Sequence, residues 1–145
     1  MEIEKLLLEG RTVQVSPIGY SMYPLIVPGR DTVQIKRVDV SRLRRGDVAL
    51  YRREGSILVL HRIWKRRGDS FFFVGDNQRD IEGPLPSQQI CGKMIAVERK
   101  GVYIPVENIR YRAFSAVWLW MRPFRPLISH AIHKLKKLAG NGSGQ

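Results

Sequence analysis

The chain has 145 residues, and its 25 Lys and Arg against 13 Asp and Glu give a formal net charge of +12. This length is typical of one domain with its own hydrophobic core. Cys91 is the only cysteine, which excludes an intrachain disulfide and a thiolate metal cluster. No stretch reaches the roughly 18 apolar residues of a membrane span, and the acidic N-terminus does not resemble a secretion signal. We expect a cytoplasmic or peripheral membrane protein with no cofactor and no metal.

The first part of the chain predicts a short helix followed by a β domain. Residues Glu2 to Leu8 can form one or two helical turns before Gly10, within an N-terminal segment 1–11. A mainly β domain is expected over 12–108, because short β-branched and aromatic runs alternate there with Gly, Pro or charged turns. The expected strands are Thr12–Val15, Thr32–Val38, Asp47–Arg52, Ile57–Trp64, Ser70–Val74, Gly92–Arg99 and Val102–Val106.

The C-terminal part, 109–139, predicts a basic amphipathic helical segment, followed by a flexible tail over 140–145. Apolar residues recur at helical spacing within Ala113–Leu138, and Pro123 and Pro126 divide the pattern into two helices. No acidic residue follows Glu107, whereas seven Lys and Arg do. Residues 113–138 could therefore lie on an anionic membrane surface, or their apolar residues could cover the β domain.

Three polar side chains fall at predicted strand ends, and together they could perform nucleophilic catalysis. Ser21 lies in the turn Gly19-Tyr20-Ser21-Met22-Tyr23-Pro24, and His61 lies within Ile57–Trp64 on the same face as Val59 and Ile63. Asp76 and Asp80 follow the strand that ends at Val74. A serine hydroxyl needs a base to take its proton, and a base works better when an acid fixes its tautomer.

Four short motifs, in this order, resemble the catalytic domain of type I signal peptidases. They are Gly19-x-Ser21-Met22-x-Pro24, Arg45-Gly46-Asp47-Val48, His61-Arg62-Ile63 and Gly75-Asp76-Asn77, spread over a little more than half of the chain. The resemblance implies the β fold that signal peptidases share with LexA-type proteases. A histidine at the second position resembles the serine–histidine branch of this superfamily.

The resemblance also implies a role for each matching residue. Ser21 would be the acylating nucleophile and His61 the general base. Asp80 is our first choice as the acid that orients His61, Asp76 would brace its loop, and Glu82 stays open as a further choice. Met22 would be a core residue beneath the serine turn. Activity should fall as the pH drops through the pKa of His61, near 6.5 if unperturbed.

Two departures from the family pattern concern the oxyanion and the membrane anchor. Many family members carry a hydroxyl residue two positions before the nucleophile, where this chain has Gly19, so the oxyanion hole would depend mainly on backbone N–H groups. The usual N-terminal membrane anchor is also missing. The basic C-terminal segment would replace it, or the enzyme would be soluble.

The function expected from these residues is a serine endopeptidase that cleaves a leader or signal peptide bound in an extended conformation. A LexA-type autoprotease is the nearest enzymatic alternative, although only twenty residues precede Ser21. The alternative from another class is a non-catalytic basic β module that binds a membrane or nucleic acid. Nucleic acid is the less favoured of these partners.

Overall fold

The computed structural model describes residues 2–53, 57–121 and 135. The elements, in chain order, are α1 (Glu2–Leu8), β1 (Val13–Val15), β2 (Asp31–Lys36), the 3-10 helix η1 (Val40–Arg42), β3 (Val48–Arg53), β4 (Ile57–Arg67), β5 (Ser70–Val74), β6 (Glu82–Pro86), the 3-10 helix η2 (Ser87–Gln89), β7 (Ile90–Arg99), β8 (Val102–Pro105) and α2 (Ile109–Trp120). The mainly β fold predicted from the sequence is confirmed, as are the short N-terminal helix and a helix after the sheet.

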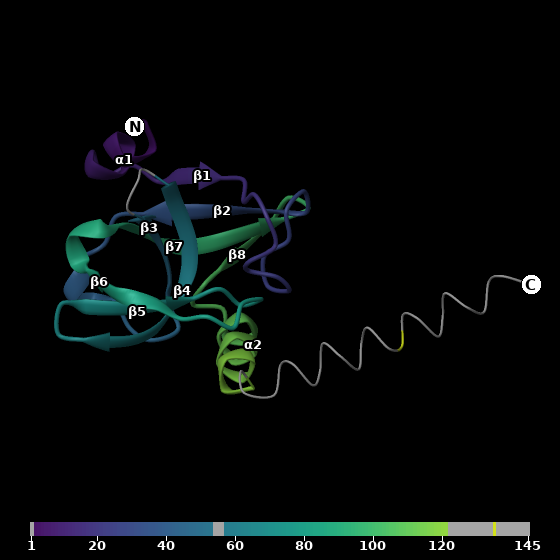
Figure 1. Cartoon of the computed structure of the whole chain (residues 1–145). Coiled ribbons are helices and arrows are strands. Elements are labelled where there is room, and N and C mark those ends of the chain that lie inside the picture. Colours follow the sequence, from purple (N-terminus) through teal and green to yellow (C-terminus); the bar gives the residue numbers. More distant parts are fainter. Residues whose placement is uncertain (1, 54–56, 122–134, 136–145) are drawn as a thin grey trace, which may run out of the picture.

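The strands form one eight-stranded antiparallel sheet that curls around the core (Figure 1). The strand order is β1-β2-β7-β3-β4-β5-β6, and β8 pairs with β7 outside this path. Strand β6 was not expected from the sequence, because Gly83, Pro84 and Pro86 are poor strand residues. It lies at the edge of the sheet beside β5, where a residue without an N–H is tolerated.

Successive side chains along the central strands point alternately to the two faces of the sheet, and this divides the core into two clusters. Leu50 of β3 packs with Met22, Ile26 and Ile35 in one cluster, which Leu58 and Leu60 of β4 flank. The neighbouring Tyr51 packs with residues of β5 in the other cluster, which includes Ala49, Ile63, Phe71 and Phe73. Because successive side chains of a strand point to opposite faces, His61 lies on the face of Tyr51 and Arg62 on the face of Leu60.

Helix α2 packs against the sheet at the end of the described chain (Figure 1). Asn108 caps its N-terminus, and the side chains of Ser115 and Leu119 are buried. The indole Nε1 of Trp118 donates a 2.9 Å hydrogen bond to the carbonyl oxygen of Asp76. The helix begins four residues before the expected Ala113, and the second helix expected after Pro126 lies outside the described residues. In the part of the chain that the structure describes, neither helix has the length and apolarity to cross a membrane.

Candidate active site

Ser21 lies in the turn that follows β1 and precedes β2. Tyr23 N donates to the Tyr20 carbonyl, and Ile26 N donates to the Met22 carbonyl, so the chain reverses tightly around the serine. Met22 is only 4% exposed and fixes the turn to the core, as predicted. Gly19 has φ of 85°, a conformation that residues with a β-carbon rarely adopt. This backbone explains why position 19 carries no hydroxyl residue.

The loop after β5 closes over the serine turn. The backbone N–H of Asn77 donates a 2.8 Å hydrogen bond to the carbonyl oxygen of Ser21. At Gly75, an added β-carbon would lie 2.7 Å from that same oxygen, which is far inside van der Waals contact. Glycine at position 75 is therefore required for the close approach of the two segments.

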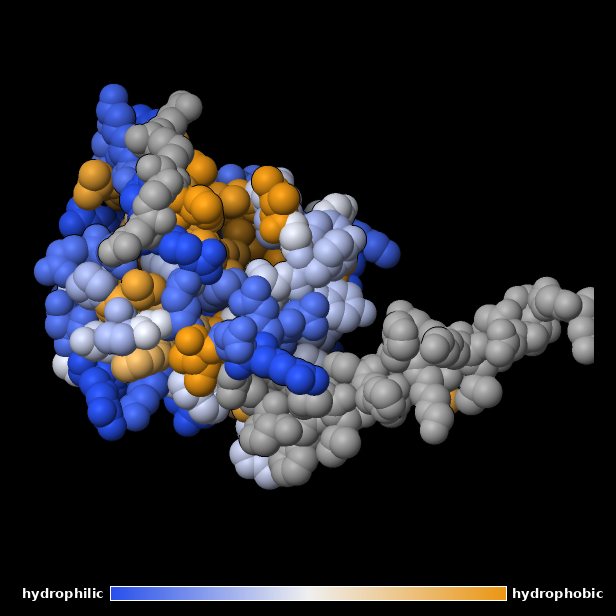
Figure 2. All heavy atoms as spheres, viewed as in Figure 1, coloured by the Kyte–Doolittle hydropathy of each residue, from blue (hydrophilic) through white to orange (hydrophobic). Residues whose placement is uncertain are grey.

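A mostly apolar cavity of about 290 Å³ lies beside Ser21. Its walls come from α1, β1, the serine turn and the first half of β4, and they include Ile3, Val15, Ile18, Met22, Leu58 and Leu60. Apolar side chains gather in a hollow between α1, β1 and β4 in the view of Figure 2. A cavity of this size and lining suits a small apolar side chain of a bound peptide.

His61 is held by a chain of hydrogen bonds that the sequence did not suggest. Its Nδ1 lies 3.1 Å from the hydroxyl oxygen of Tyr51, and that hydroxyl donates a 2.7 Å hydrogen bond to Oε1 of Glu82. Arg53 Nε donates to both carboxylate oxygens of Glu82, at 2.7 and 3.2 Å. The hydroxyl group of Tyr51 has a single proton, which it donates to Glu82 in a hydrogen bond. Nδ1–H of His61 must therefore be the donor in its contact with Tyr51. This tautomer leaves the lone pair of Nε2 available as a base.

Burial keeps the imidazole neutral. His61 is 4% exposed, and its burial is the largest cause that lowers its pKa, to about 4. The positive charge of Arg53 lowers the pKa further, against the opposing negative charges of Glu82 and Asp76. Burial by itself would raise the pKa of Glu82, but its hydrogen bonds from Tyr51 and Arg53 outweigh burial and lower it. The value near 6.5 applies to an unperturbed histidine, and burial in the core removes that condition.

This pKa predicts a flat pH profile for reactions that use His61 as a base. The base is active when it is neutral, and neutrality is lost only as the pH falls through about 4. The rate at which a serine-reactive fluorophosphonate labels Ser21 should therefore be constant between pH 5 and 8 and fall below pH 5. Intact mass, measured at a series of times at each pH, gives this rate. Circular dichroism at each pH separates this fall from acid unfolding. A fall centred near pH 6.5 would contradict the buried, neutral state of His61.

Asp80, the first choice as the acid that orients His61, does not contact the histidine. Asp80 lines the cavity of about 450 Å³ that also contains His61, but its side chain is exposed and has no hydrogen bond to the histidine. The carboxylate connected to His61 is instead that of Glu82, the further choice left open by the sequence, and the connection runs through the hydroxyl group of Tyr51. The pairing of β6 with β5 explains why Glu82 reaches Tyr51. It sets Glu82 opposite Phe73, and the ring of Phe73 stacks on Tyr51 with 4.1 Å between the ring centroids.

Asp76 braces its loop, as predicted, through a buried ion pair with Arg62. The two carboxylate oxygens accept hydrogen bonds of 2.7 and 2.8 Å from Nε and Nη2 of Arg62, and both side chains are at most 1% exposed. Nη1 of Arg62 donates to the carbonyl of Gly46 at 2.7 Å. The ion pair outweighs the cost of burial and raises the pKa of Arg62, which stays charged.

Ser21 and His61 lie in two separate cavities, and no hydrogen bond joins their side chains in the described part of the chain. The loop over residues 75–78 contacts both the serine turn and the cavity of His61. Asn77 holds the carbonyl of Ser21, while Gln78 lines the cavity of His61. Hydrogen bonds in a resting catalytic site are often long and shorten only when substrate binds.

In the comparisons with known proteins, neither the protein-family models nor the curated proteins gave any match to this chain. The residues around Ser21 and His61 are therefore the observations from which a function can be inferred.

Proposed function

We propose that this protein is a serine endopeptidase of the signal-peptidase type, which cleaves a leader or signal peptide through an acyl-enzyme on Ser21. The observation that carries the proposal is the chain Glu82–Tyr51–His61. It supplies a buried, neutral imidazole whose Nδ1–H is already donated, so that Nε2 is left to accept a proton.

The reaction follows from these roles. Oγ of Ser21 attacks the peptide carbonyl carbon while its proton passes to Nε2 of His61, which forms a tetrahedral intermediate. The intermediate expels the leaving amine, which takes that proton from His61, and an ester remains on Ser21. Water then attacks the ester with His61 again as base, which releases the carboxylate product and restores the serine.

A free strand edge beside Ser21 supports binding of an extended peptide. Strand β5 pairs with β4 only over Arg62–Arg67, so the segment Ile57–His61 has β3 on one side and no strand on its other side among the described residues. Leu58, Val59 and Leu60 of this segment also line the cavity of Ser21. A peptide that adds to this edge would place alternate side chains in the cavity, which favours a small apolar residue before the scissile bond.

The direct test is covalent labelling with a fluorophosphonate, which reacts with activated serines and needs no knowledge of the peptide. We expect one adduct per chain by intact mass, and peptide mapping should place it on Ser21. Acid-unfolded protein serves as the control, because the activation depends on the folded site. If the folded chain stays unmodified while a related peptidase in the same reaction is labelled, the endopeptidase proposal fails and the binding-module alternative is favoured.

Tyr51→Phe is expected to slow this labelling by about tenfold to a hundredfold. The change leaves Nδ1–H of His61 buried without an acceptor. This destabilises the tautomer in which Nε2 is free to accept a proton, by about 1–3 kcal/mol, and lowers the labelling rate accordingly. The ring of Tyr51 still packs on Phe73, so circular dichroism should be unchanged. Tyr103→Phe is the matched control, because Tyr103 is half exposed on β8. Equal rates for the two variants would show that Tyr51 does not position the histidine.

A further inference from the structure

A third cavity, larger than those of Ser21 and His61, lies between the connection of η1 to β3, strand β7 and α2. Its volume is about 870 Å³. Five cationic side chains from these segments line it, against the two carboxylates of Asp47 and Glu107. The cations are Arg42, Arg44, Arg45, Lys93 and Arg112. An excess of positive charge around one concave space favours an anionic ligand.

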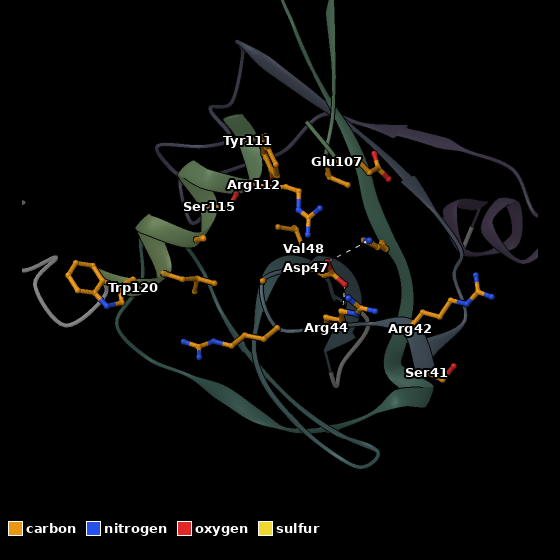
Figure 3. A pocket seen from close by; sticks show the side chains of 16 residues that line it. Ser41, Arg42, Arg44, Asp47, Val48, Glu107, Tyr111, Arg112, Ser115 and Trp120 are labelled. Atoms are coloured by element: carbon orange, nitrogen blue, oxygen red, sulfur yellow. Dashed lines mark hydrogen bonds and ion pairs between the residues drawn. The ribbon is translucent and has the colours of Figure 1, made fainter. Parts of the chain in front are cut away.

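The carboxylate of Asp47 does not neutralise the arginines of this cavity. Its Oδ2 accepts the backbone N–H of Arg44 at 2.9 Å, and its Oδ1 lies 3.6 Å from Nζ of Lys93 (Figure 3). Figure 3 shows Arg112 extending from α2 into the space above Asp47. Among the described residues, no carboxylate forms an ion pair with the guanidinium of Arg44 or Arg112.

The cations indicate which kind of anion fits the cavity. Four of the five are arginines. A guanidinium group presents several N–H donors in a fixed plane, which matches the oxygens of a phosphate.

The outward face of α2 indicates which phosphate compound fits. Ile109, Val117 and Trp120 lie on it and are 82%, 53% and 73% exposed. Trp120 also lines the cationic cavity, so the apolar face and the anion site are continuous. Tryptophan is enriched at membrane–water interfaces, where its ring meets apolar chains on one side and polar groups on the other. A free anion or an acidic peptide would leave this apolar face without a role.

We propose that the cavity binds the phosphate headgroup of an anionic phospholipid while the outward face of α2 lies in the membrane interface. The phosphate would lie between Arg44 and Arg112, and Val117 and Trp120 would contact the upper acyl chains. This inference goes beyond the peptidase proposal and does not depend on Ser21 or His61.

The test is sedimentation of the full chain with vesicles of phosphatidylcholine, alone or mixed with phosphatidylglycerol. Binding is expected on the mixed vesicles. Arg44→Gln/Arg112→Gln should weaken it about 30-fold, because this double variant loses two contacts of a basic side chain with an anionic membrane, each of which changes the affinity by about fivefold. The matched control is Lys5→Gln/Arg11→Gln, which removes the same charge from α1 and the residues after it, and should change binding by less than about threefold. Equal losses in the two variants would overturn the site.

Two further arms separate a lipid from a free anion. Val117→Ser/Trp120→Ser should weaken binding to the mixed vesicles while Arg44 and Arg112 are intact, and an unchanged affinity would overturn the role of α2. Inorganic phosphate should not release the protein more than chloride does at equal ionic strength; selective release would make this a site for free phosphate instead. Fluorophosphonate labelling of Ser21 in the same samples reports the peptidase proposal separately.

Discussion

Ser21→Ala is expected to abolish fluorophosphonate labelling, and His61→Ala to slow it by about a thousandfold. Labelling requires the serine oxygen itself, so no adduct can form without it. A positioned general base contributes about 10²–10⁴ in rate, and the contact of Tyr51 with Nδ1 of His61 would leave Nε2 available for that role. Intact mass at a series of times gives the rate for each variant.

Ser16→Ala is the matched control for the nucleophile, because Ser16 is an exposed serine just before the same turn and also lines the apolar cavity. It should be labelled at the parent rate. An adduct that persists in Ser21→Ala would place the nucleophile elsewhere. If His61→Ala reacts at the parent rate, the histidine is a core residue and the base must be sought among other groups.

Asp76→Ala is expected to lower the free energy of unfolding by about 3–5 kcal/mol. The change leaves the guanidinium of Arg62 charged and 1% exposed with no carboxylate beside it. Urea unfolding followed by circular dichroism measures the loss. Because the N–H of the next residue holds the carbonyl of Ser21, labelling of Ser21 should decline as well.

The double variant Arg62→Leu/Asp76→Leu should recover most of this loss, because two apolar residues leave no buried charge unpaired. Glu9→Gln is the surface control. It breaks an ion pair with Arg11 whose side chains are 70% and 46% exposed, and should cost less than about 1 kcal/mol. If Asp76→Ala unfolds at the parent urea concentration, the buried pair does not stabilise the fold as described.

The sequence was sufficient to predict most of the sheet, because its strands are made of residues that fit a half-buried pleated surface. The alternation in β4 correctly placed Val59, His61 and Ile63 on one face. Strand β6 escaped prediction because its Gly83, Pro84 and Pro86 are stabilised by tertiary pairing with β5 and not by local preference. The role of α2 in lining a cavity likewise depends on packing between distant segments.

The candidate site was predicted in part. Ser21, His61 and the bracing role of Asp76 follow from the motifs, whereas Glu82 comes beside His61 only through the register of β6. Tyr51 could have been found. In the β3–β4 hairpin, Ala49 lies opposite His61. Tyr51, two residues after Ala49, is therefore on the same face and diagonal to His61, within reach of the imidazole. The low pKa of His61 could not have been read from the chain, because burial depends on the complete core.

Asp76 and the residue after it contact three separate parts of the molecule. Its side chain holds Arg62, its carbonyl oxygen holds the indole of Trp118, and the following N–H holds the serine turn. The carbonyl of Asp76 and the N–H of Asn77 belong to the same peptide group, which thus joins α2 to the segment that carries Ser21. A displacement of the helix from the sheet would therefore act on Ser21 through two hydrogen bonds that share one peptide group.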